Sequence, residues 1–521
     1  MAVRDVLPRH TRGYLWITFL VGIFMLMALS ENGVFSRDSI LPNPGAALAR
    51  ANQKPIETES RYNDVNVSMG YKEQAASTTT PILEYTTIPE SPALKSAATS
   101  IPENPHADTK TAQKTFNGLD PKDVVILVKT GATSIWRRMP AHMSTTLGNP
   151  ALTPNVVYYS DSPDNINGNP VIDVLANVSS TLKSSPDFEL YTKSKEVASN
   201  NLYLESGSME GDFYLPGGWR LDKYKFVPMF QHVSEYMPGK KWYVYMEDDN
   251  YFFWEMLYSW LGTLDHTKPL LIGSPAFRLG EDFAHGGSGF AISGQALKQS
   301  FGIEKDLASK FESYAQEQCC GDQVLSHVLH SKGVERYKDL DGGGWAALQS
   351  LPHWRIGFGT WNWCSPIMNI HKVHQSDISR LSVFQRDFYA REGIHARLRY
   401  KDIYLSLAKP NINAAEKSEW DNYATAKTFA SSYDPDTSGE TKKELSQKEL
   451  EKKPWYSKES CRKACGEWEQ CLSWKYADDN CALDHTAAMG QRIDAGIRMV
   501  SGWMLERIEK LEAGGCVPLD F

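Results

Sequence analysis

The sequence predicts an α/β protein built on a doubly wound sheet, and its first ordered segment carries this prediction. Residues 123–129 (DVVILVK) form a continuous apolar run, which is typical of a strand buried on both faces. A segment compatible with a helix follows over residues 133–147, and a second strand follows over residues 156–159. A strand, a helix and a strand at this spacing indicate the first unit of a sheet with helices on its faces.

The later segments continue this pattern. We expect a strand from Trp242, a helix over residues 254–264, strands over residues 270–273 and 286–293, and a helix that starts near Asp322. In a sheet of this kind, ligands bind beyond the carboxyl ends of the strands. Asp161 and the acidic residues 247–249 lie at such ends in the predicted arrangement.

Three consecutive acids, Glu247, Asp248 and Asp249, follow the aromatic strand. Carboxylates packed this closely repel one another and are costly to desolvate unless a cation neutralises them. Mn²⁺ or Mg²⁺, held by one or two carboxylates and by the diphosphate of a substrate, would supply that charge. The alternative is that the acids solvate a loop, with Asp249 capping a helix that begins near Phe253.

The amino terminus predicts a membrane anchor. Residues 14–29 are uncharged and apolar, and arginines precede them. The run is close to the about 17–25 residues of a transmembrane helix, and the basic flank places the preceding tail in the cytosol. We expect a cytosolic tail over residues 1–13, a signal anchor over 14–30 and a flexible stem rich in Ser, Thr and Pro over 31–116. A cleaved signal peptide is the alternative, but the run ends without a small-residue cleavage site.

Composition and cysteine positions favour a lumenal protein that does not bind nucleic acid. The net charge of −8 over 521 residues gives no basic footprint for nucleic acid. The eight cysteines fall mainly in two groups, a pattern typical of disulfides in an oxidising compartment. Asn66 and Asn177 each begin an Asn-x-Ser sequon, which predicts two glycosylation sites.

Two segments offer backbone amides and a carboxylate to a ligand. The segment His285–Phe290 contains Gly286, Gly287 and Gly289, which allow close approach of a ligand, although a tight turn before a strand also explains them. Asp322 lies where a helix begins. It either caps that helix or acts as a general base for an acceptor hydroxyl.

Histidines and a lysine complete the set of candidates. His371 and His374 lie three residues apart and could complete a metal shell or touch a phosphate, whereas a packing role near the tryptophans of this segment is the alternative. Lys225, within residues 217–226, adds a positive charge for a diphosphate unless it is simply exposed on a helix.

The order of these segments resembles the fringe-like, inverting β-1,3-glycosyltransferases, a family that includes the core 1 galactosyltransferases. The resemblance spans residues 120–380, and no single motif carries it. The matching segments are the strand 125–130, the aromatic and acidic segment 242–251, the Gly-Gly-x-Gly-Phe segment 286–290, the pair Gly321-Asp322 and the histidine strand 371–374. Glu247 departs from the family pattern, which has Asp at the first acidic position.

The resemblance implies a GT-A-like (Rossmann-like) mixed sheet flanked by helices. It implies metal-dependent, inverting transfer of a hexose or N-acetylhexosamine from a UDP-sugar to a hydroxyl of a glycan or glycoprotein, through a β-1,3 linkage. Asp322 would be the catalytic base, and Asp249 and His371 would bind Mn²⁺ (or Mg²⁺), with Glu247 and His374 as further candidates. The donor would contact Glu247, Asp248, Lys225, Gly286, Gly287 and Gly289. No covalent nucleophile is expected, because a single displacement requires only a base and a neutralised leaving group.

The carboxyl-terminal residues resemble an apple/PAN-like module, whose pattern is Cys461-x3-Cys465, Cys471-x2-Trp474-x-Tyr476 and Cys481-x-Leu483. The resemblance implies the disulfides Cys461–Cys481 and Cys465–Cys471, and a carbohydrate or protein ligand. Cys516 is left to pair with Cys319, Cys320 or Cys364. We therefore expect a glycosyltransferase domain over residues 117–408, a linker over 409–454 and the module over 455–521.

Together these features predict a single-pass type II protein of the Golgi membrane with a lumenal, UDP-sugar-dependent glycosyltransferase domain. The alternative is a non-catalytic membrane protein that binds carbohydrate or protein on a glycosyltransferase-like fold.

Overall fold

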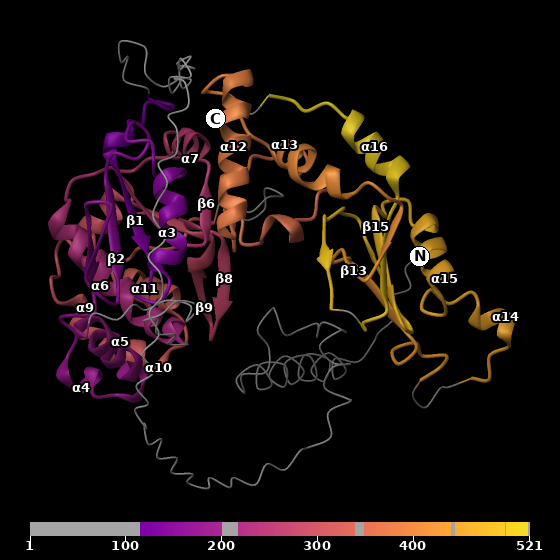
Figure 1. The fold of residues 1–521 in the computed structure, drawn as a ribbon, viewed down its shortest axis with the longest axis horizontal. Helices are drawn as coiled ribbons and strands as arrows, with labels where there is room; N and C mark the ends of the chain where they lie inside the picture. Colours follow the sequence, from indigo (N-terminus) through magenta and orange to yellow (C-terminus); the bar gives the residue numbers. More distant parts are fainter. Residues whose placement is uncertain (1–114, 201–216, 339–347, 439–442, 495, 519–521) are drawn as a thin grey trace, which may run out of the picture. The chain divides into compact units, whose positions relative to one another are not determined.

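The computed structural model describes residues 115–200, 217–338, 348–438, 443–494 and 496–518, which belong to one compact unit of the chain (Figure 1). The predicted signal anchor, nearly all of the predicted stem and Asn66 lie outside these residues. Within the described ranges, no helix is both long enough and apolar enough to cross a membrane.

A seven-stranded mixed sheet forms the centre of the predicted glycosyltransferase domain (Figure 1). Its strands are β1 (Val124–Lys129), β2 (Val156–Ser160), β3 (Asp164–Ile166), β4 (Asn169–Asp173), β5 (Trp242–Glu247), β7 (Leu271–Gly273) and β10 (Phe290–Ser293). The order across the sheet is β3-β4-β2-β1-β5-β10-β7. Strands β4, β2, β1 and β5 run parallel, whereas β3 and β10 run antiparallel to their neighbours.

Helices cover both faces of this sheet because its central strands are apolar on both faces. Along β1, Ile126 belongs to one apolar cluster and Leu127 to the other. The first cluster contains residues of α3 (Ile135–Ser144), α7 (Trp254–Leu261) and α12 (Gln375–Glu392). The second contains residues of α6 (Asp222–Tyr236), α8 (Gly294–Gln299) and α11 (Gly321–His330). The mixed sheet flanked by helices agrees with the predicted GT-A-like architecture.

Two small two-stranded sheets extend from the central sheet. Strand β6 (Asn250–Phe252) pairs with β11 (Asn369–His371), and β8 (Pro275–Arg278) pairs with β9 (Glu281–Ala284). The predicted strand over residues 286–293 begins only at Phe290, because Gly286–Ser288 form a 3₁₀ turn. The remaining helices of this region are α4 (Ser180–Lys183), α5 (Glu189–Ser199), α9 (Leu307–Lys310), α10 (Glu312–Glu317) and α13 (Tyr400–Ile403).

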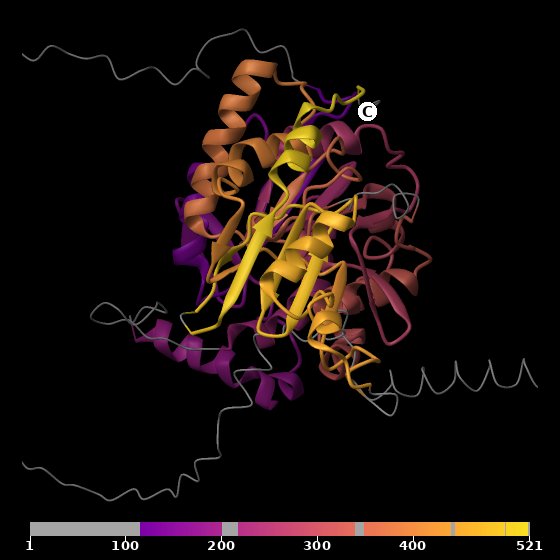
Figure 2. The same cartoon turned by 90° about the vertical axis from the view of Figure 1, so that its right-hand side faces the viewer.

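A second sheet, of five antiparallel strands, forms the carboxyl-terminal part of the chain (Figure 2). In spatial order its strands are β12 (Glu416–Ser418), β18 (Met499–Trp503), β15 (Ser473–Ala477), β16 (Asn480–Asp484) and β14 (Lys427–Ala430). A separate two-stranded sheet pairs β13 (Trp420–Asp421) with β17 (Gln491–Arg492). In sequence, β13 lies between β12 and β14, and β17 lies between β16 and β18. The helices here are α14 (Gln447–Leu450), α15 (Lys458–Glu467), which packs against β15, and α16 (Leu505–Ala513).

The carboxyl-terminal sheet begins earlier than predicted. Strands β12 and β14 lie within residues 409–454, so this segment is an integral part of the sheet and not a linker. β12 lies at one edge of the sheet and β14 at the other, and both are largely exposed. Exposed edge strands carry polar and charged residues, so the sequence did not indicate these two strands.

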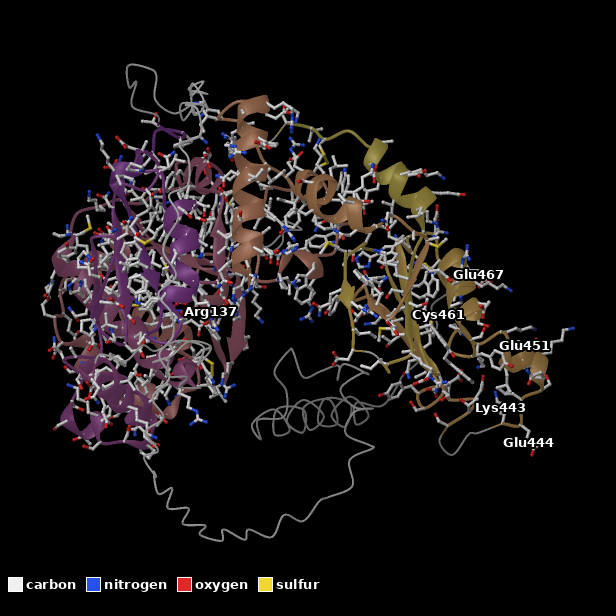
Figure 3. The ribbon with its side chains drawn as sticks, in the orientation of Figure 1. Arg137, Lys443, Glu444, Glu451, Cys461 and Glu467 are labelled. Carbon is white, nitrogen blue, oxygen red and sulfur yellow. A yellow bond between two sulfur atoms is a disulfide. The ribbon has the colours of Figure 1, made fainter. Side chains whose placement is uncertain are left out.

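Four disulfides pair all eight cysteines. Cys461 on α15 is joined to Cys481 (Figure 3), and Cys465 is joined to Cys471, the same pairs that the resemblance implies. Cys516 pairs with Cys364, one of the three partners left open by the sequence. The two remaining cysteines, the neighbours Cys319 and Cys320, pair with each other.

Candidate functional site

The candidate site lies where the parallel strands β1 and β5 end side by side. Lys129, the last residue of β1, is in register with Glu247, the last residue of β5. From β1 the chain passes to β2 on one side, and it returns later to β5 on the other side. Adjacent strands whose connections leave in opposite directions open a crevice at their carboxyl ends, where open α/β sheets bind ligands.

Asp248, the middle acid, ties the loops after β1 and β5 together. Its Oδ2 accepts hydrogen bonds from the hydroxyls of Thr130 (2.7 Å) and Ser134 (2.9 Å). Its Oδ1 forms an ion pair with Arg138 at 2.6 Å. Both carboxylate oxygens of Asp248 are engaged by the chain and the residue is buried, so Asp248 holds the two loops together. This arrangement does not support the predicted contact of Asp248 with a sugar donor.

Glu247, the last residue of β5, has different partners from Asp248. Its carboxylate accepts a hydrogen bond from the hydroxyl of Tyr245 (2.8 Å) and lies 3.3 Å from the ammonium of Lys129. Burial alone would lower the pKa of Lys129, but the nearby Asp222 and Glu247 carboxylates outweigh it and raise that pKa above its usual value. Glu247 is therefore paired with a fixed cation of the chain, and part of its side chain remains exposed.

Asp249, the third acid, is the one whose charge is not balanced. Its Oδ1 is buried and has no hydrogen-bond partner among the described residues. The nearest cation, Arg138, is 3.8 Å from its Oδ2. Burial, together with the charges of Glu247 and Asp248, raises the pKa of Asp249 to about 7. A carboxylate in this environment requires a proton or a cation.

His371 supplies the second candidate ligand, because the pairing of β6 with β11 brings it beside the acidic loop. The backbone amide of Val373 donates to the carbonyl of Asp249 at 2.9 Å and fixes this arrangement. The Nδ1–H of His371 donates to the carbonyl of Ser350 (2.9 Å), so Nε2 carries the lone pair. This Nε2 lies 3.5 Å from Asp249 Oδ1, and burial lowers the pKa of His371 to about 4.

Two acceptors therefore face each other, the carboxylate Oδ1 of Asp249 and the neutral imidazole Nε2 of His371. Carboxylate oxygen is a ligand that suits Mn²⁺ and Mg²⁺, and a neutral imidazole nitrogen is a common metal ligand, so these two residues could hold a divalent cation. Within the described ranges, the chain brings no three His, Cys, Asp or Glu side chains together as a metal cage. Two protein ligands are nevertheless compatible with a cation that also binds substrate phosphates.

The turn Gly286–Ser288 joins this pair to Asp322. A Cβ at Gly287 would lie 2.7 Å from His371 Nε2, and a Cβ at Gly286 would lie 3.1 Å from Asp322 Cβ. A side chain at position 287 would therefore force the His371 ring to move, whereas one at position 286 would require its neighbours to yield by only a few tenths of an ångström. The predicted interpretation of these two glycines as residues of the site is consistent with this geometry.

Asp322 lies in the first turn of α11, at the other end of the glycine turn. Its Oδ2 accepts a hydrogen bond from the amide of Gly286 (2.6 Å), and its Oδ1 accepts one from the amide of Gln323 (2.9 Å). Cys320, not Asp322, is the N-cap residue of α11. Asp322 is therefore not the N-cap residue, although its Oδ1 satisfies one amide of the first turn, and its other partner belongs to the glycine turn.

Lys225 does not have the role predicted from the sequence. The side chain is 1% exposed, and its ammonium contacts Asp161 and Asp222, each at 2.9 Å. It also donates to the carbonyl of Thr130 at 3.0 Å. An ammonium has three N–H groups, and all three are occupied inside the protein, so Lys225 offers none to a diphosphate.

Two other predicted site residues also have structural roles. His374 is the N-cap of α12, where its Nδ1 accepts a hydrogen bond from the amide of Ser376 (3.3 Å). This nitrogen is therefore occupied at the helix start and is not directed at Asp249 as Nε2 of His371 is. Gly289 has φ 71°, in the left-handed region that favours glycine. A Cβ there would lie 2.5 Å from Cζ of Phe252 and 2.9 Å from the carbonyl oxygen of Tyr245. Gly289 is thus required by core packing and does not line a cleft.

Sequence reasoning missed Arg138 and a pair of buried asparagines. Asn250 donates to the carbonyl of Gly287 (2.6 Å), and Asn369 donates to Asn250 Oδ1 (2.8 Å) and to the carbonyl of Ser288 (2.7 Å). These bonds hold the glycine turn on the β6–β11 pair. Asn250 follows the acidic triplet directly, which is a signal that could have identified it, whereas no local spacing marks Arg138.

The fold and the site define a class: a GT-A-like α/β domain with acidic residues at the carboxyl end of its parallel strands. Residues 119–332 match the family described as Fringe-like, which confirms over this range the resemblance predicted from the motifs. Part of the chain is 39% identical to the β-1,3-N-acetylglucosaminyltransferase lunatic fringe of Danio rerio, over 12% of this chain and 21% of that relative. The chain thus matches about a fifth of the length of this relative.

Proposed function

We propose that this protein is an inverting glycosyltransferase that moves a hexose or N-acetylhexosamine from a UDP-sugar to a hydroxyl of a glycan or glycoprotein, in β-1,3 linkage. The proposal rests on one observation: Asp249, His371 and Asp322 lie around the turn Gly286–Ser288, beyond the ends of parallel strands. The similarity of residues 119–332 to the Fringe-like family supports this class of reaction.

Mn²⁺, or Mg²⁺, is the cofactor that we propose, with Asp249 Oδ1 and His371 Nε2 as its protein ligands. Support comes from the buried Oδ1 without a hydrogen-bond partner and from the lone pair that His371 directs at it. When bound, such a cation neutralises charge on a leaving diphosphate. Arg138, whose side chain is 32% exposed, is placed to add positive charge beside the same acids.

Asp322 is the proposed catalytic base. In a single displacement, a bond forms between the acceptor oxygen and the anomeric carbon while the bond from that carbon to the diphosphate breaks. The acceptor hydroxyl loses its proton, which passes to the carboxylate of Asp322. The amides of Gly286 and Gln323 hold the carboxylate in one orientation and leave lone pairs available for this proton.

We also propose a lumenal location, on a single-pass type II protein of the Golgi membrane. Four disulfides support an oxidising compartment, and Asn177 is exposed in the turn before α4, where a glycan would be accommodated. The carboxyl-terminal sheet is proposed to be an apple/PAN-like module that binds carbohydrate or protein, on the strength of its cysteine pattern.

A donor screen tests the proposed activity. The purified full-length protein is incubated with a panel of UDP-sugars, Mn²⁺ and mixed glycan and glycopeptide acceptors, and UDP release is measured with and without EDTA. We expect one or a few donors to release UDP, and EDTA to abolish that release. Binding of a UDP-sugar without any turnover would instead indicate the non-catalytic alternative. If no donor binds or reacts in a Mn²⁺-dependent way, the proposal is wrong.

A further inference from the structure

The disulfide between the adjacent residues Cys319 and Cys320 lies two residues before Asp322. It occupies the connection between α10 and α11, and its two Cα atoms are 3.7 Å apart. A bond between neighbouring cysteines closes a small covalent ring around the intervening peptide. Such a ring removes torsional freedom from a connection that would otherwise be free to vary.

The start of α11 has no side-chain cap that could replace this ring. Cys320 is the N-cap residue, and its side chain makes no capping hydrogen bond. Ser, Thr, Asp or Asn ordinarily occupies such a position and satisfies an amide of the first turn. Within the first turn, the Asp322 carboxylate accepts from the amide of Gln323, and its other oxygen accepts from the amide of Gly286.

Packing against α6 also holds the helix start. A Cβ at Gly321 would lie 2.8 Å from Cε2 of Phe226, so the backbone rests directly on that ring. Phe226 is buried on α6. The backbone just before Asp322 is thus restrained by both the aromatic ring and the disulfide, and small changes there would redirect the carboxylate.

We propose that the Cys319–Cys320 disulfide is a positioning element for Asp322, and that opening it suppresses transfer while donor binding is retained. This inference rests on the proposed role of Asp322 as the base. The donor side of the site is held by other elements, since Asp249 follows β5 and His371 lies on β11. Asn250 and Asn369 bind the carbonyls of Gly287 and Ser288, so the glycine turn stays on the β6–β11 pair without Asp322. Opening the disulfide should therefore affect the proton acceptor more than the cation ligands.

The bond is accessible to a reductant. Cys319 is exposed and Cys320 is partly exposed, whereas Cys461, Cys465, Cys471 and Cys481 are each no more than 1% exposed. A dithiol such as dithiothreitol transfers two electrons and two protons to the disulfide, which becomes two thiols while the dithiol becomes a cyclic disulfide. Mild reduction should therefore open Cys319–Cys320 before the bonds of the carboxyl-terminal sheet.

The experiment compares the full-length wild type with two matched double variants. In one, Cys319→Ser and Cys320→Ser remove the disulfide beside the proposed base. In the other, Cys364→Ser and Cys516→Ser remove a partly exposed disulfide elsewhere. Alkylation and mass spectrometry report which cysteines a low concentration of dithiothreitol has opened. Transfer rate, KM for the UDP-sugar and hydrogen exchange at the amides of Gly286 and Gln323 are then measured.

Opening the bond should lower kcat by about 10- to 100-fold, leave KM for the donor unchanged and be reversed by reoxidation. The Cys319→Ser/Cys320→Ser variant should begin at the low rate and not respond to reductant, whereas the other double variant should respond like the wild type. Exchange at Gly286 and Gln323 should become faster, because both amides are held by Asp322.

Other outcomes would overturn the inference. These are an unchanged kcat after the bond is opened, a parallel loss of donor binding, or unchanged exchange at the two amides. Hydrogen exchange does not require activity, so it tests the positioning of Asp322 even if no donor is transferred. A wild type that transfers no sugar but shows faster exchange on reduction would refute the proposed function and leave the positioning intact.

Discussion

At the scale of single residues, the three consecutive acids have three different environments. Asp248 is saturated by hydroxyls and a guanidinium, and Glu247 is paired with Lys129. Asp249 has a buried oxygen without a hydrogen-bond partner among the described residues. Neighbouring side chains, and not the acids themselves, therefore decide which carboxylate is available to a cation.

Replacing Asp249 should separate stability from function. Burial raises the pKa of Asp249 to about 7, so in the absence of a cation the folded state binds more protons than the unfolded state between about pH 4 and 7. Stability conferred by this group therefore falls as pH rises through that range. Asp249→Asn should raise the melting temperature at pH 7.5 in EDTA, and should change it little at pH 4.

The same Asp249→Asn variant should bind UDP-sugars in the presence of metal about 100-fold more weakly or worse. Replacing a residue that only supports a metal ligand already costs about 10- to 100-fold in metal affinity, and Asp249 is proposed to be a ligand itself. Isothermal titration with Mn²⁺ present measures this affinity. The exposed loop residue Asp265 provides the control, and Asp265→Asn should bind like the wild type. Wild-type affinity in the Asp249 variant would exclude it as a ligand.

Asp322→Asn should keep donor binding and lose transfer. The amide oxygen of Asn is still able to accept the hydrogen bond from Gly286, but the side chain cannot take up the acceptor proton. We expect kcat to fall by about 10²- to 10⁴-fold while KM for the donor is unchanged. Near-normal turnover would reduce Asp322 to a residue that anchors the glycine turn.

At the scale of elements, the site is assembled from five parts: the loop after β1, the loop after β5, the turn before β10, the β6–β11 pair and the start of α11. The buried asparagines Asn250 and Asn369 join the turn before β10 to the β6–β11 pair. The site is therefore sensitive to changes in elements that contain no proposed catalytic residue.

Gly287→Ala tests the turn. The added methyl group would collide with the ring of His371, whose Nε2 it would approach to 2.7 Å, so that ring must move. Metal-dependent donor binding should weaken by about 10- to 100-fold. Gly466, on α15, has nothing within 4 Å of an added Cβ. Gly466→Ala should therefore leave binding unchanged and stabilise the helix by up to about 1 kcal/mol. Equal binding in both variants would contradict the contact.

Adjacent arginines on α3 offer a matched comparison. Arg138 pairs with Asp248 at 2.6 Å, whereas Arg137, labelled in Figure 3, is exposed. Arg138→Ala leaves the buried Asp248 without its cation and should lower the free energy of unfolding by about 1–3 kcal/mol. It should also weaken donor binding. Urea unfolding measures the stability and titration with a UDP-sugar measures the binding, and Arg137→Ala should change neither. Equal behaviour of the two variants would argue against a role for Arg138.

At the scale of the whole molecule, the two sheets share contacts and a covalent link. Trp503 and Ile508, from the carboxyl-terminal part, belong to the same apolar cluster as Trp363 and Tyr404. The hydroxyl of Tyr404 donates to Glu512 at 3.0 Å, and Cys364–Cys516 joins residues separated by 152 positions. The carboxyl-terminal sheet is thus part of the folded unit that contains the candidate site.

Loss of this link should be measurable. Cys364→Ser with Cys516→Ser should lower the free energy of unfolding by about 2–4 kcal/mol, because the disulfide restricts a long loop in the unfolded chain. Unfolding should remain a single transition by calorimetry, since the apolar cluster is shared. Two separate transitions in the wild type would show that the two sheets unfold independently.

Much of the fold followed from local patterns, and the errors have local causes. The buried strands β1 and β5 were predicted because each is a continuous run of apolar or aromatic residues, and α11 was predicted because its apolar residues recur on one face. The strands β12 and β14 were missed because exposed edge strands carry polar residues. Lys225 and His374 were assigned to the site because a sequence shows a charge or an imidazole without showing which groups already satisfy it.

The sequence by itself determined the α/β pattern, the acidic motif at a strand end, the cysteine groups and the resemblance to fringe-like enzymes. These features depend on neighbours along the chain. Only the tertiary structure decided that Asp249 faces His371, that Asp322 binds Gly286 and that Asp248 is occupied by Arg138. The reason is physical: the availability of a side chain depends on burial and on partners that lie from 36 to more than a hundred residues away in the chain, and local sequence does not encode those contacts.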